Sequence, residues 1–137
     1  MALECVLIHE TELPIPMTCA DGAAITKGSI LALSDPNTVA TTTGDNDVVA
    51  GVAAESKIAN DGVTKLAVYK RGIFKVFVGA GGCTVGAALI TDTATGAANE
   101  LATADINSEN IFGRALETGA DTESILAELN PFTMNLA

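Results

Sequence analysis

Side chains that commonly carry out catalysis are scarce in this 137-residue sequence. It contains one histidine, one tyrosine, four phenylalanines and no tryptophan. A Ser-His-Asp or Cys-His arrangement would have to use His9, and no Gly-x-Ser-x-Gly string marks a nucleophile elbow. A polar surface position beside Glu10 is the simpler interpretation of His9. We therefore expect no catalytic residue and no enzymatic activity.

Cysteine is also sparse, and its spacing fits none of the usual frameworks. The three cysteines, Cys5, Cys19 and Cys83, are odd in number and form no Cys-x-x-Cys pair. This argues against a disulfide scaffold and suits a reducing compartment. Cys5, His9 and Cys19 lack the spacing and the fourth ligand of a compact zinc site. We interpret the cysteines as small apolar residues with free thiols, and we expect no metal ion.

Two segments rich in glycine or aspartate lack the residues that a ligand site would need. Residues 79–82 follow a predicted strand, but no Gly-Lys-Ser/Thr string follows, as a phosphate loop requires. Residues 43–47 resemble the start of a calcium loop without the glutamate at its twelfth position. A tight turn and a solvated hairpin loop are the simpler interpretations, and no cofactor is expected.

Positive charge is scarce, and most of it lies in one short stretch. The formal net charge is −10, divided as −7 over residues 1–56, +4 over residues 57–75 and −7 over residues 76–137. Such an acidic chain disfavours nucleic acid and anionic membranes as partners. The central bases form either a solvated strand face or a contact with an acidic partner. The residues of this candidate contact are Lys65, Lys70, Arg71 and Lys75.

Long apolar runs are absent, so the chain offers no stretch of the ~18 residues that a membrane helix needs. The acidic N-terminal segment also lacks the basic start of a secretory signal. Short apolar runs instead alternate with Gly, Asp, Asn and Pro, a pattern typical of all-β proteins. Residues 72–78 form the clearest predicted strand. Residues 121–129 begin like a helix, but we predict a strand there, whereas residues 97–109 fit a helical turn or a loop.

An internal repeat is the most informative feature of the sequence. The pattern Thr-x-Gly-x-x-Leu occurs in residues 26–31 and in residues 84–89, an offset of 58. Gly-x-Ala-x-Glu occurs in residues 51–55 and 113–117, an offset of 62. The difference falls in a polar loop, where insertions cost little. The sequence therefore predicts an all-β fold, a small barrel or sandwich built from two similar units, residues 21–79 and 80–131.

The N-terminal segment precedes this repeat. Pro14 and Pro16 cannot both lie in a central strand, because each removes a donor from the ladder. We therefore predict an extended arm of residues 1–20 and a β-barrel domain of residues 21–137. Because the arm is apolar, we expect it to dock outside its own barrel, for example by adding a strand to an exposed edge of a partner. Its candidate contact residues are Leu3, Val6, Leu7 and Ile8.

Four segments, residues 25–31, 49–55, 72–74 and 113–117, resemble in order and spacing the capsid decoration (cement) proteins of tailed phages, which are small β-barrel proteins. The resemblance covers residues 20–131. It implies a structural virion protein that binds the outer capsid surface and stabilises contacts between major capsid protein subunits. It also implies a homo-oligomer, with a trimer favoured over a dimer, synthesis in the bacterial host cytoplasm, and no active site.

A β-barrel module that binds a small ligand or a carbohydrate is the alternative function. Such a module needs an aromatic-lined cavity. The sequence offers few aromatic residues for one, namely Tyr69, Phe74, Phe77, Phe112 and Phe132. The scarcity of catalytic side chains places an enzyme third.

Overall fold

The computed structural model describes residues 4–42, 47–79, 81–92, 100–104 and 108–133, and within these ranges it contains strands and no helix. The strands are β1 (Val6–His9), β2 (Ile15–Cys19), β3 (Ile30–Asp35), β4 (Thr38–Thr41), β5 (Val49–Ala53), β6 (Lys65–Tyr69), β7 (Gly72–Val78), β8 (Ala88–Asp92), β9 (Glu100–Thr103), β10 (Asn110–Ala115) and β11 (Ser124–Thr133). The predicted all-β fold class is confirmed.

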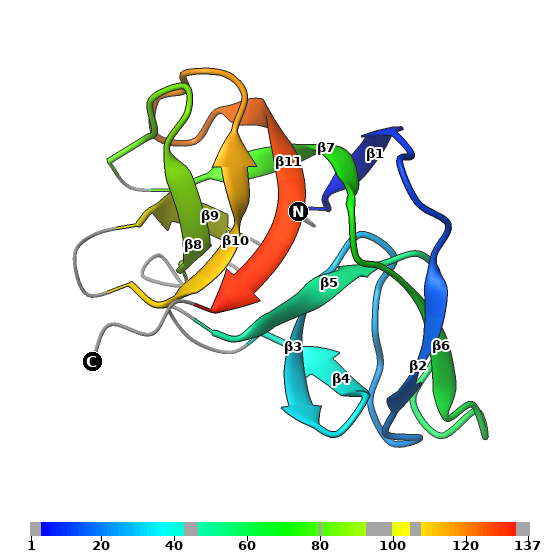
Figure 1. Ribbon diagram of the computed structural model, residues 1–137. Helices are drawn as coiled ribbons and strands as arrows, with labels where there is room; N and C mark the ends of the chain where they lie inside the picture. The colour runs from blue at the N-terminus through cyan, green and yellow to red at the C-terminus, as the bar shows by residue number, and fades with distance from the viewer. Residues whose placement is uncertain (1–3, 43–46, 80, 93–99, 105–107, 134–137) are drawn as a thin grey trace.

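The strands close into two barrels of the same topology (Figure 1). In the first barrel, β2-β4-β3-β5-β6, the ring is closed by a parallel β2–β4 pair and an antiparallel β2–β6 pair. In the second, β7 pairs in parallel with β9 and antiparallel with β11, which closes β7-β9-β8-β10-β11. Strand β1 is added to an edge of β7. The prediction of a small β-barrel fold built from two similar units is confirmed.

Strand registers reproduce the two offsets of the sequence repeat. Leu31 pairs with Gly51 in the first barrel, and Leu89 pairs with Gly113 in the second. From the first barrel to the second, the leucine of this pair therefore shifts by 58 residues and the glycine by 62. The Thr-x-Gly turn is repeated too, before β3 in the first barrel and before β8 in the second. Its glycine has a φ of 86° at Gly28 and 88° at Gly86, a left-handed backbone conformation that glycine adopts without strain.

The predicted boundary between residues 79 and 80 is wrong, because β7 opens the second unit and is the equivalent of β2. Cys19 of β2 pairs in parallel with Val39, and Val78 of β7 pairs in the same way with Leu101. The two leading strands share no sequence pattern: β2 has Pro16 where β7 has a lysine. The repeat could therefore be traced only from the turn that follows them.

The N-terminal segment belongs to the fold of its own chain. In β1, Val6 lies opposite Lys75 and Leu7 opposite Phe74, both residues of β7. The backbone N–H of Cys5 donates to the carbonyl of Gly28 at 2.9 Å, which ties the segment to the first barrel. The expected arm of residues 1–20 does not match this strand order, because it contains β2, a strand of the first barrel that lies outside the expected domain of residues 21–137.

Strand β2 accommodates Pro16 because an N–H at this position would have no partner in the sheet. The N–H of Thr18 donates toward β4, to the carbonyl of Asn37 at 2.8 Å, whereas the N–H of Cys19 donates toward β6, to Thr64 at 3.0 Å. Position 16 has the parity of position 18, so its N–H would face β4. Because β4 pairs with β2 only from Thr18 onward, Pro16 removes no donor from the ladder.

The two barrels share part of their hydrophobic core. One buried cluster lies within the first barrel, and a larger one fills the second. The larger cluster also includes Ile30, Val49 and Val52 from the outer face of the first barrel. All five residues of β5 are buried, because this strand faces the interior of its own barrel on one side and the second barrel on the other. Neither barrel therefore buries its apolar surface without the other.

The two segments of ambiguous sequence contain strands. Residues 124–129, predicted as part of a strand, lie in β11. Within residues 97–109, β9 pairs with both β7 and β8, so the helical turn or loop expected there is wrong for residues 100–103. Long-range pairing overrides the local preference of this Ala-containing segment. Residues 43–46, 80, 97–99 and 105–107 lie outside the described residues.

Burial of the Cys5 thiol makes the free energy of unfolding depend on pH in the alkaline range. Burial raises the pKa of its thiol from 9.0 to about 12. The stability that this thiol contributes is therefore complete below pH ~9 and is lost as the pH rises toward 12, because the unfolded chain ionises first. Between pH 8 and pH 10.5, wild type should lose about 2 kcal/mol more unfolding free energy than Cys5→Ala. Urea unfolding at the two pH values measures this difference, and equal losses in both proteins would contradict it.

Candidate interaction surface

A row of residues crosses the outer face of three neighbouring strands. Val6 of β1 lies opposite Lys75 of β7, which in turn lies opposite Leu126 of β11. Lys75 is exposed, Val6 is 53% exposed, and Ile8 on the same strand is 43% exposed. Leu7 is only partly buried but packs against the core of the second barrel, so it is not available as a contact. We call Val6, Ile8, Lys75 and Leu126 the β1 face.

Strand β1 also has a free edge. Among the described strands it pairs only with β7, whose opposite edge is taken by β11 and whose last two residues pair with β9. A strand edge with unpaired backbone groups and exposed apolar side chains is a place where another chain can add a strand. Leu3, the remaining candidate residue of the N-terminal segment, lies outside the described residues.

The structure spreads the four predicted basic residues over three locations. Lys65 begins β6, and its Nζ donates to Thr18 Oγ1 at 3.2 Å. Lys70 and Arg71 form the link between β6 and β7, beyond the other end of β6. Lys75 belongs to the β1 face. A partner contact by any of them stays a prediction.

Lys57, also in the basic stretch, is buried, and its burial has no clear sequence signal. Its Nζ donates to the carbonyls of Asp21, Ala23 and Ile58 at 2.9, 2.8 and 3.1 Å. Asp61 Oδ1 lies 3.3 Å away, and the lysine side chain is 1% exposed. Hydrogen bonds from the Val63 N–H, and more weakly from Lys57, hold the pKa of Asp61 below its ordinary value. Lys57 is thus a structural cation and cannot contact a partner.

The end of the first barrel beside the link between the barrels is hollow. We call this hollow of about 200 Å³ the barrel-1 end; its lining residues are Met17, Leu33, Val49, Ala50, Lys70, Arg71 and Pro131. Leu33 is 44% exposed, and Ile15, at the start of β2, is 41% exposed. Leu13, two residues earlier, is 76% exposed. The exposed Leu33 and the two bases Lys70 and Arg71 therefore lie together at this end.

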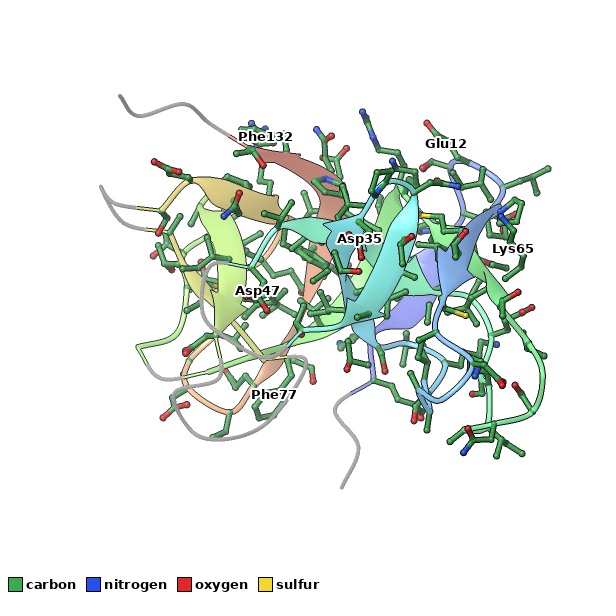
Figure 2. All side chains as sticks on the ribbon, turned by 90° about the horizontal axis from the view of Figure 1, so that it is seen from below. Glu12, Asp35, Asp47, Lys65, Phe77 and Phe132 are labelled. Atoms are coloured by element: carbon green, nitrogen blue, oxygen red, sulfur yellow. The ribbon has the colours of Figure 1, made fainter. Side chains whose placement is uncertain are left out.

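A groove of about 300 Å³ lies on the outer face of the second barrel. We call it the barrel-2 groove; its lining residues are Gly86, Ala88, Ile111, Gly113, Arg114, Glu128, Asn130 and Phe132. Arg114 lies opposite Glu128 in the β10–β11 pair. Phe132 is 49% exposed and lies at the outer margin of the molecule (Figure 2). It is the only aromatic residue among the described residues that line the groove, and Phe74 and Phe112 are buried in the core.

The junction between the barrels is sealed by an aromatic pair. The rings of Tyr69 and Phe74 meet edge to face, with centroids 5.8 Å apart and planes at 68°. Burial, and then a hydrogen bond with Glu10, raise the pKa of Tyr69. Burial likewise raises the pKa of Cys19, against the opposing charge of Lys57. These groups are neutral packing elements near neutral pH.

The described residues contain no grouping of three or more His, Cys, Asp or Glu side chains that could hold a metal ion. His9 is exposed at the end of β1. In the same residues, no helix has the length and apolar character to span a membrane. The absence of enzymatic activity, metal and cofactor stays a prediction.

The fold is similar to that of a phage head protein. The chain aligns with the crystal structure of the N base of the head fiber gp8.5 in bacteriophage phi29 with a TM-score of 0.55 and 17% sequence identity, over 85% of this chain and 92% of that one. No family model and no curated protein matches the sequence. The predicted likeness to phage capsid-associated proteins thus holds at the level of the fold, and the decoration role is a matter for proposal.

Proposed function

We propose that this protein is a decoration protein of a tailed-phage head. In this role it binds the outer capsid surface and stabilises contacts between major capsid protein subunits, after synthesis in the host cytoplasm. The observation that carries the proposal is the β1 face, an exposed apolar strand on a chain of net charge −10. The fold similarity to the base of a phage head fiber supports it. The acidic charge disfavours packaged nucleic acid and membranes as partners.

In this role the β1 face contributes to binding mainly through the burial of its apolar side chains. An apolar surface or strand of the capsid protein that covers Val6 and Ile8 removes them from water, and a fully buried side chain of this size contributes about 1.5–3 kcal/mol. Lys75 lies between Val6 and Leu126 in the row and adds attraction to an acidic shell. Several copies held on one lattice multiply such modest contacts.

The double variant Val6→Glu/Ile8→Glu tests this surface. We expect it to fold, because both side chains are exposed, and to bind cognate capsids at least tenfold more weakly, because two buried apolar contacts become buried carboxylates. Co-sedimentation with expanded capsids that lack the protein measures occupancy, and thermal melting checks the fold.

The matched control is Ile58→Glu, which changes a 76% exposed isoleucine in the turn after β5 and should bind like wild type. Undiminished occupancy of the Val6→Glu/Ile8→Glu protein would remove the β1 face from the contact. A wild-type protein that does not co-sediment with the capsids would refute the decoration function itself.

A further inference from the structure

The repeat shows which surfaces of one barrel are covered in the other. Ile30, Val49 and Val52 of the first barrel belong to the core cluster of the second, and Tyr69 packs against that cluster. The offsets given by the strand registers, 58 for β3, 62 for β5 and 59 for β6, identify their equivalents in the second barrel. These equivalents are Ala88, Ile111, Arg114 and Glu128. All four line the barrel-2 groove, which no described part of the chain fills.

The complementary surface is also repeated. Phe74, Phe112 and Leu129 belong to the core cluster that also includes the first-barrel residues, and the Phe74 ring meets that of Tyr69. Their equivalents, by the offsets 59 for β2 and β6 and 62 for β5, are Ile15, Ala50 and Lys70. Ala50 and Lys70 line the barrel-1 end, and Ile15 is 41% exposed. Each chain thus has one filled junction of this kind, between its own barrels. It also has the two surfaces of a second such junction, the barrel-2 groove and the barrel-1 end, and no described part of the chain covers them.

The two free surfaces differ from their equivalents in the filled junction by charged residues of opposite sign. Tyr69 of the filled junction corresponds to Glu128 in the groove, and Leu129 corresponds to Lys70 at the barrel-1 end. Two uncharged side chains of the filled junction are therefore replaced, one by an acid on one free surface and the other by a base on the other free surface. Oppositely charged groups on facing surfaces favour the matched orientation. Apolar side chains remain on both sides, with Phe132 in the groove and Leu33 at the end.

We propose that the barrel-2 groove binds the barrel-1 end of a second copy of this chain, in the arrangement that joins the two barrels within one chain. In this junction Lys70 of one copy faces Glu128 of the next, and the exposed Leu33 packs near Phe132. A second copy is the occupant that the repeat specifies, because it presents the equivalent of the surface already seated on the first barrel. The proposal goes beyond capsid binding and requires no capsid.

Such a junction is heterologous, since each copy contributes a different surface. It closes into a ring if the rotation between copies allows, and otherwise extends as a filament. Each surface can therefore be disrupted separately, because a chain that lacks one surface still has the other. Leu33→Asp damages the barrel-1 end and leaves the groove intact. Phe132→Asp damages the groove and leaves the end intact.

Sedimentation velocity of the full chain, over a range of concentrations up to ~1 mM, measures assembly. Wild type should form species of at least twice the 13.9 kDa chain mass, and each variant alone should be monomeric. An equimolar mixture of the two variants should form a 1:1 dimer, because it retains one intact junction. Ile58→Asp is the matched control, since Ile58, like Leu33, is an exposed large apolar residue, and it should assemble like wild type.

A monomeric wild type, assembly by either variant alone, or a mixture that stays monomeric would each overturn the proposal. Circular dichroism checks that the variants are folded. If one is not, Lys70→Glu for the end and Glu128→Lys for the groove replace the pair. Each of these should assemble less than wild type, and the chain that carries both changes should recover, because the facing charges are then exchanged. Failure of that recovery would also overturn the proposal.

Discussion

Replacement of Lys57 by methionine should lower the free energy of unfolding by about 3 kcal/mol. The change keeps the length of the side chain but removes the ammonium donor that serves the carbonyls of Asp21, Ala23 and Ile58. Those carbonyls lie around a side chain that is 1% exposed, so water reaches the vacated position poorly. Denaturant unfolding monitored by circular dichroism measures the loss.

Lys27→Met is the control for this experiment, because it exchanges the same two residue types at an exposed position. We expect its unfolding free energy to stay within about 0.5 kcal/mol of wild type. If Lys57→Met were as stable as Lys27→Met, the buried ammonium would not hold the turns of the first barrel together.

Replacement of Gly113 by alanine should destabilise the protein by about 3 kcal/mol or more, and Gly51→Ala should do the same in the first barrel. An alanine Cβ at Gly113 would overlap the carbonyl oxygen of Glu128, and one at Gly51 would overlap that of Tyr69. Both obstacles are backbone atoms of the neighbouring strand, which cannot move without breaking the sheet. Thermal and denaturant unfolding report the cost.

Gly22→Ala is the matched substitution at a site with room. The nearest atom to its added Cβ is Asn60 Oδ1 at 3.7 Å, an ordinary contact, so stability should stay near that of wild type or rise slightly. If Gly51→Ala or Gly113→Ala behaved like Gly22→Ala, the close approach of the strands would not be what these glycines provide.

The candidate surface was only partly predictable. The sequence identified Val6, Ile8 and Lys75 as exposed contact candidates, because apolar or basic residues stand out on an acidic chain. It did not show that Val6 lies opposite Lys75, or that Leu126 completes the row. These residues come from strands far apart along the chain, and their register depends on pairings that no local pattern encodes.

The sequence by itself determined the all-β class and the duplication with its two offsets, because turn glycines and short apolar runs act locally and recur in both copies. Only the tertiary structure decided that β1 and β2 complete the sheets, that β7 begins the second unit, and that Lys57 is buried. Those outcomes depend on which distant strand offers a free edge and on which carbonyls the closed barrel turns inward. The same dependence explains why one copy of a repeated face is buried in the core while its equivalent remains an open groove.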